Sequence, residues 1–124
     1  MRVLATIATV GVYLVHLSTQ LSAQEAAQGA GAQVQRGREI ADKVCWVCHV
    51  TGADQQYSPI LRVPGPDFRV IAKRPNTTTA SLSAFLHTTH RTENKPYTMP
   101  NPMLNDETIA AVVAYIMSLK PSSP

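Results

Sequence analysis

The sequence of 124 residues contains only two cysteines, Cys45 and Cys48. A structural zinc site would need two further ligands, usually from a second cysteine or histidine pair, and no other cysteine is present to supply one. Charge is also sparse: the net charge of +3 falls to about +2 if Arg2 is removed with the N-terminal segment. Nucleic-acid binding requires Lys and Arg clustered on one face, so the composition argues against that class of protein.

The sequence lacks the alternation of apolar and polar residues that predicts strands, and it has no internal repeat. Apolar residues recur instead at helical spacing, which predicts an all-α domain. We expect a first helix over Val34 to Val47 and a short helix over about Thr79 to Thr88. One or two helical turns are expected near Phe68. A final helix is capped by Asn105 or Asp106 and is stopped by Pro121, so residues 121–124 form a C-terminal tail.

No apolar run reaches the ~20 residues needed to span a bilayer. The longest run, Val3 to Leu17, follows the positive start Met1-Arg2 and precedes Leu21-Ser22-Ala23, which ends in a small residue. This arrangement is typical of a secretory signal peptide. We predict a signal peptide over residues 1–23, with an uncleaved membrane anchor as the alternative. The small, polar residues Gln24 to Gln33 then predict a flexible leader.

The two cysteines belong to the run Cys45-Trp46-Val47-Cys48-His49. This C-x-x-C-H pattern is the signature of covalent attachment of a c-type haem. Two thiols at this spacing lie one turn apart and can add to the two vinyl groups of one porphyrin, and the histidine that follows can bind the iron. A structural disulfide, a thiol redox pair and a zinc site are the alternatives. A thioredoxin-like pair would follow a strand, whereas the segment before the motif is predicted to be helical.

Residues 34–120 resemble the class I (mitochondrial-like) c-type cytochromes, in their bacterial exported branch. The features that carry the resemblance are, in order, Gly37 eight residues before Cys45, the C-x-x-C-H motif, Gly65-Pro66, Met99-Pro100 and a final helix that ends Val113–Leu119. The resemblance implies a small cytochrome c fold, in which three to four helices surround one covalent haem c. It also implies that the N- and C-terminal helices cross at Gly37 and Tyr115.

The resemblance implies a role for particular side chains. Cys45 and Cys48 would form the haem thioethers, and His49 and Met99 would be the axial ligands of the iron. The carbonyl of Pro66 would accept the hydrogen bond of the second ring nitrogen of His49. Such a bond fixes the orientation of the ring and raises its basicity as a ligand.

The sequence departs from the family pattern in several places. Met103 lies four residues after Met99 and is a rival sixth ligand. The Met-Pro step favours Met99, and Met103, which abuts the cap of the final helix, is expected to pack in the core. Ala41 stands where many family members have an aromatic residue, so the helix crossing is expected to pack differently. His87 and His90 could also bind the iron, but we expect them to be polar residues near a helix end.

An iron with both axial positions filled has no open site for a substrate, and Met/His ligation raises the reduction potential. We therefore predict a periplasmic electron carrier rather than an enzyme. Its partners would be redox proteins such as a dehydrogenase, an oxidase or another cytochrome, and it would act as a monomer or a loosely bound subunit. No stable membrane insertion is expected after signal cleavage. The alternative is a haem enzyme or small-ligand sensor with a labile or open sixth iron site.

Overall fold

The computed structural model describes residues 24–88 and 99–121, and it divides the chain into two units, Met1–Ala32 and Gln33–Pro124. The predicted signal peptide, His90 and the tail residues 122–124 lie outside the described residues. In the first unit, residues 24–32 are helical and exposed. The composition predicts a flexible leader over 24–33, and the structure differs in showing helix there. Alanine has the highest helix propensity and is frequent in this segment, although each glycine costs ~1 kcal/mol relative to alanine.

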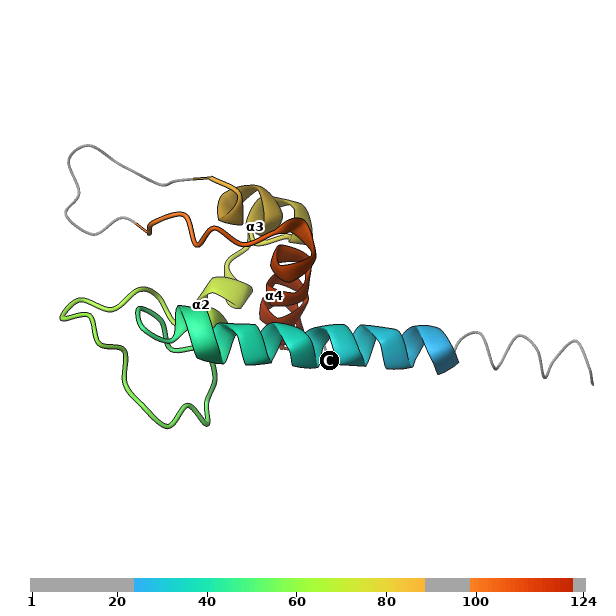
Figure 1. Ribbon diagram of the computed structural model, residues 1–124, viewed down its shortest axis with the longest axis horizontal. Helices are drawn as coiled ribbons and strands as arrows, with labels where there is room; N and C mark the ends of the chain where they lie inside the picture. Colours follow the sequence, from blue (N-terminus) through green and yellow to red (C-terminus); the bar gives the residue numbers. More distant parts are fainter. Residues whose placement is uncertain (1–23, 89–98, 122–124) are drawn as a thin grey trace, which may run out of the picture. The chain divides into compact units, whose positions relative to one another are not determined.

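The second unit begins with helical residues 33–40, which lead into the π-helical turn η1 (Ala41–Cys45). The α-helices α2 (Phe68–Lys73), α3 (Thr79–Leu86) and α4 (Asp106–Ser118) follow. α4 packs against both α2 and α3 (Figure 1). The described residues contain no strand, so the all-α prediction is confirmed. Within the same residues, no helix combines the length and the apolar character needed to cross a membrane.

The starts of α2, α3 and α4 are set by local side-chain caps. The capping oxygens belong to Asp67, Thr78 and Asn105, and each accepts a hydrogen bond from a backbone N–H in the first turn of its helix. Such caps satisfy donors that have no partner within the helix. The sequence left Asn105 and Asp106 open as caps of the last helix, and the structure selects Asn105. Asp106 then lies in the first turn, where the helix dipole favours negative charge.

The first helix of the second unit crosses α4 at Gly37. A Cβ atom on Gly37 would overlap the backbone carbonyl of Ala111 and lie 2.9 Å from the Cβ of Tyr115. Only glycine permits so close an approach of two backbones. The predicted crossing at Gly37 and Tyr115 is therefore confirmed. Ala41, one turn further on, is completely buried, so its small side chain is part of the core.

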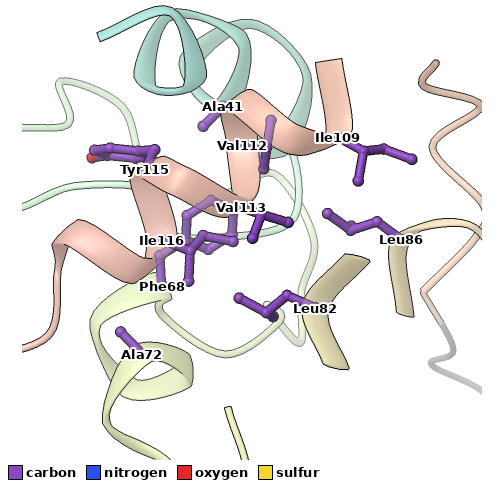
Figure 2. Packing of buried hydrophobic residues seen from close by; sticks show 10 residues of the cluster. All are labelled: Ala41, Phe68, Ala72, Leu82, Leu86, Ile109, Val112, Val113, Tyr115 and Ile116. Carbon is purple, nitrogen blue, oxygen red and sulfur yellow. The ribbon is translucent and has the colours of Figure 1, made fainter. Parts of the chain in front are cut away.

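The apolar core lies where α4 meets α2, α3 and the start of η1 (Figure 2). From α4, the side chains that belong to the core are Ile109, Val112, Val113, Tyr115 and Ile116. The other elements contribute Ala41, Phe68, Ala72, Leu82 and Leu86. This core holds the C-x-x-C-H turn, α2 and α3 against one common support.

Candidate functional site

The C-x-x-C-H motif begins at the last residue of η1. The carbonyl of Cys45 accepts hydrogen bonds from the backbone N–H groups of Cys48, at 3.1 Å, and His49, at 2.9 Å. These bonds close a tight turn, after which both cysteines and the histidine line one cavity. The π-helical turn before it widens the helix by one residue, a feature found frequently at functional sites. Local backbone hydrogen bonding therefore brings the three reactive side chains of the motif together.

The ring of His49 is buried and held on two sides. Its Nδ1 lies 2.8 Å from the carbonyl oxygen of Pro66, and its ring centroid lies 5.4 Å from that of Phe68. A carbonyl oxygen can only accept a hydrogen bond, so Nδ1 carries the proton and donates it. The other nitrogen, Nε2, then has the lone pair that a metal ion requires. The contact expected for Pro66 is present.

The loop that carries Pro66 is fastened to the motif by backbone hydrogen bonds. The N–H of Gly65 donates to the carbonyl of Cys48 at 2.7 Å, and the N–H of Phe68 donates to the carbonyl of Val50 at 3.0 Å. At the start of the same loop, the backbone carbonyl of Thr51 accepts a hydrogen bond from the Tyr115 hydroxyl of α4 at 2.9 Å. These contacts fix the Pro66 carbonyl relative to the His49 ring.

A cavity of about 690 Å³ lies beside the motif. Its volume is within the range of ~300–1,000 Å³ that is usual for small-molecule and cofactor sites. The residues predicted from the sequence to bind a cofactor all line it, namely Cys45, Cys48, His49, Pro66 and Met99. Apolar walls come from Val44, Phe68, Ile71, Leu82, Phe85, Leu86, Val112 and Ile116. The cavity thus combines two thiols, an imidazole and a thioether with an apolar lining.

Met99 and Met103 occupy different environments. Met99 is partly buried, packs against the apolar core and lines the cavity. Met103 is 88% exposed and does not line it. The Met103 backbone has a φ of 55°, in the left-handed region, where its N–H donates to the Asn101 side chain at 2.8 Å. Of the two rival thioethers, the structure therefore places only Met99 with the motif.

The side chain of His87 is directed elsewhere. Its Nδ1 lies 2.7 Å from the carbonyl of Ser83, and its Nε2 lies 3.0 Å from Oδ1 of Asp106. Both ring nitrogens are therefore occupied at the junction of α3 and α4, and His87 does not line the cavity.

Cys45 and Cys48 are not joined by a disulfide. Burial raises the pKa of Cys45 to about 11, with smaller contributions from Cys48 and Asp42. The thiol is therefore protonated at neutral pH, as expected for an apolar setting. A zinc site is formed by a set of His, Cys, Asp or Glu ligands. Within the described residues, no group of three or more such side chains could hold a metal ion.

Some residues at the cavity were not singled out in the sequence. Phe68, which packs against the His49 ring, was predicted only as part of a short helix. The stretch between α2 and α3 also contributes a polar wall of Arg74, Asn76 and Thr77, joined by Ser81 of α3. Their part in the site depends on how α2 and α3 pack against α4.

Comparison with known proteins agrees with this geometry. A family model described as Cytochrome c matches residues 34–120. Searches of curated proteins and of solved structures found no match. The matched range contains the whole cavity, and Cys45 and Cys48 have the spacing that covalent haem attachment requires. The volume of the cavity, its apolar lining and its donor atoms all fit such a group. The chain therefore belongs to the cytochrome c family, whose cofactor is a covalently bound haem c with its iron.

Proposed function

We propose that this protein is a periplasmic carrier of single electrons whose haem iron is bound by His49 and Met99. The observation that carries the proposal is the shared cavity, which is lined by these two residues together with Cys45 and Cys48. When bound, haem supplies an iron that gains and loses one electron. A site with both axial positions filled leaves no position for a substrate, which favours electron transfer over catalysis.

The residues around the cavity support this role by orientation and by polarity. Pro66 holds the proton on Nδ1 of His49, so the Nε2 lone pair is available to the metal. Met99 offers a neutral, soft sulfur, and such a ligand favours the reduced iron and raises the reduction potential. The apolar walls from α3 and α4 exclude water, which disfavours the additional positive charge of the oxidised state.

The ligand assignment is tested by absorption spectroscopy of the haem-loaded protein. We expect the ferric protein to show the charge-transfer band of a methionine sulfur bound to iron. The Met103→Ala variant should keep this band, because Met103 is exposed and outside the cavity. The Met99→Ala variant should lose it. A high-spin ferric spectrum of the unmodified protein at neutral pH would contradict the carrier, and would support a haem enzyme or sensor with an open sixth site.

The periplasmic location rests on the signal peptide predicted over residues 1–23. The charge of Arg2, the apolar run that follows and the small residue Ala23 support it. The haem-loaded protein should appear in the exported soluble fraction, and its mass should correspond to a chain that starts at Gln24. Recovery of the uncleaved chain in the membrane fraction would favour the anchor instead.

Family members act with redox proteins as partners, and a dehydrogenase, an oxidase or another cytochrome is proposed here. A carrier must leave its partner after each electron is transferred. Such contacts are small, typically below ~1,200 Å² of total buried surface. We therefore propose a monomer or a loosely bound subunit, with the side of the C-x-x-C turn, near Cys45 and Cys48, facing the partner.

A further inference from the structure

Thr51 is a completely buried polar residue that lies two residues after His49. Its hydroxyl oxygen lies 2.6 Å from Oδ1 of Asp42 and 2.9 Å from Oε1 of Gln55. A threonine hydroxyl has a single hydrogen to donate. One of these two oxygens therefore receives the hydrogen, and the other does not.

The side chain of Gln55 is already satisfied by the backbone. Its Nε2 donates to the carbonyl of Tyr57 at 2.6 Å, which fixes the orientation of the amide. Its Oε1 accepts the N–H of Thr51 at 2.6 Å. The carboxylate of Asp42 is the closer acceptor for the hydroxyl, and hydrogen bonds to an ionised acceptor are the stronger ones. The hydroxyl of Thr51 therefore donates to Asp42.

The bond between Asp42 and Thr51 joins the chain on the two sides of the C-x-x-C-H motif. Asp42 lies in η1, three residues before Cys45, and Thr51 follows the motif. Thr51 is itself held from α4, because its carbonyl accepts a hydrogen bond from the Tyr115 hydroxyl at 2.9 Å. The buried hydroxyl is therefore a fixed donor, and it holds the Asp42 carboxylate beside the motif.

The charge of Asp42 acts on the motif. Burial and the neighbouring Cys48 are the larger causes of the raised pKa of Cys45, and the Asp42 carboxylate adds to the rise. The Cys45 sulfur, which lines the cavity, therefore lies within the electric field of this carboxylate.

The nearest cation to Asp42 is shared with a second carboxylate. Nε of Arg38 lies 3.6 Å from Oδ2 of Asp42, but the guanidinium makes its closer contact with Asp54. This group of three side chains contains two negative charges and one positive charge. The negative charge of Asp42 is therefore only partly compensated.

We propose that the Asp42 carboxylate, held in place by the Thr51 hydroxyl, lowers the reduction potential of the haem iron. This proposal rests on the proposed function as an electron carrier. Oxidised iron carries one more positive charge than reduced iron, so a fixed negative charge nearby stabilises the oxidised state. The effect opposes that of Met99 and of the apolar walls, which favour the reduced iron. Thr51 is a positioning residue, because it acts through Asp42.

The charge is tested with Asp42→Asn in the haem-loaded protein, by a spectroelectrochemical titration of the reduction potential. Asparagine has nearly the same shape and keeps an oxygen that can accept from Thr51, but it has no charge. We expect a more positive potential, with a change of at least about twofold in the equilibrium constant for electron transfer. The shift should be smaller at high salt, because the Asp42 side chain is partly exposed.

The matched control is Glu39→Gln. Glu39 lies three residues before Asp42, is exposed, and accepts a hydrogen bond from the Gln35 side chain. This variant loses the same charge but keeps the bond between Asp42 and Thr51. Its potential should shift less than that of Asp42→Asn.

The part of Thr51 is tested with a double-mutant cycle. Thr51→Val removes the hydroxyl and should raise the potential, because the released carboxylate turns toward solvent and its charge is better screened. Thr51→Ser keeps a hydroxyl and should keep the original potential. In the Asp42→Asn background, Thr51→Val should cause no further shift, because no charge is left for the hydroxyl to hold. A bond with only a structural role would affect unfolding, but its effect on the potential would not depend on this charge.

Three results would overturn the proposal. The first is a potential of Asp42→Asn that does not rise, or that rises no more than that of Glu39→Gln. The second is a Thr51→Val shift that persists in the Asp42→Asn background. The third is loss of the charge-transfer band of the methionine sulfur in Asp42→Asn, because the potential would then report a changed ligand. Failure of the carrier function itself would show differently, as a high-spin ferric spectrum of the unmodified protein.

Discussion

The backbone of Gly65 lies directly against the ring of His49. A Cβ atom at residue 65 would be 2.5 Å from Cε1 and 2.8 Å from Nδ1 of that ring. No real Cβ can come so close, so any side chain at residue 65 would displace either the ring or the loop. The same loop supplies the Pro66 carbonyl that orients the ring. Gly65 therefore affects both the space for the His49 ring and the position of its hydrogen-bond acceptor.

Gly65→Ala should therefore weaken both the fold and the iron site. We expect a loss of about 1–3 kcal/mol of unfolding free energy, which is typical of overpacking, measured by denaturant titration. The visible spectrum should also change, because the His49 ring no longer meets Pro66 in the same geometry. Gly29→Ala is the control, because no atom lies within 4 Å of a Cβ added there. An unchanged spectrum in Gly65→Ala would contradict the close packing.

Gly37→Ala separates helix propensity from tertiary packing. Propensity alone predicts a gain of ~1 kcal/mol, since alanine is a better helix former than glycine. The structure predicts the opposite sign, because the new methyl group would meet the rigid backbone of Ala111 in α4. We expect a net loss of about 3 kcal/mol or more, measured by thermal or denaturant unfolding. A more stable Gly37→Ala variant would show that the two helices do not cross at this residue.

Tyr115→Phe tests the bond between α4 and the loop. The Tyr115 hydroxyl donates to the buried carbonyl of Thr51 at 2.9 Å. Its removal leaves that carbonyl without this donor, so we expect a loss of about 1–3 kcal/mol in unfolding free energy. Tyr57→Phe is the matched control, because that ring is exposed and its hydroxyl makes no hydrogen bond with a described residue. Equal stabilities of the two variants would contradict a structural role for the Tyr115 hydroxyl.

The junction of α3 and α4 should be sensitive to pH through His87. The carbonyl of Ser83 and then the carboxylate of Asp106 raise the pKa of this ring above its ordinary value. Both groups are acceptors, so both contacts are satisfied only when the ring is a cation that donates from each nitrogen. The stabilisation is fully present below the unfolded pKa of about 6.5 and is lost as the pH rises through the raised folded pKa.

We expect the difference in unfolding midpoint between the unmodified protein and His87→Ala to shrink above the folded pKa of this ring. The effect should be small and should weaken with salt, because the pair is exposed. An NMR titration of the ring gives the pKa directly. Asp106→Asn should move it back toward the ordinary value without abolishing the Ser83 contact. A ring that titrates at or below about 6.5 in the unmodified protein would refute the arrangement.

Features that depend on a few neighbouring residues were predicted correctly. The start of α4 at its cap and the buried stripe along it follow from residue type and helical period. The family was also recognisable, because covalent haem attachment requires a particular local spacing in Cys45–His49. Residues 24–32 are the exception, where composition predicted a flexible segment and the alanines form a helix instead.

Features that depend on the path of the chain needed the tertiary structure. The sequence favours Met99 over Met103 by the Met-Pro step and by the expectation that Met103 packs in the core. The structure places Met99 in the cavity but exposes Met103, so the expected core packing of Met103 is wrong. The contacts of Ala111 and Phe68 also needed the tertiary structure. Packing between distant elements places Ala111 against Gly37 and Phe68 against His49. The sequence by itself determined the cofactor and the places of α2, α3 and α4, since the motif and each helix are encoded within a few turns. The surroundings of the cofactor were decided by excluded volume between segments that are far apart in the chain.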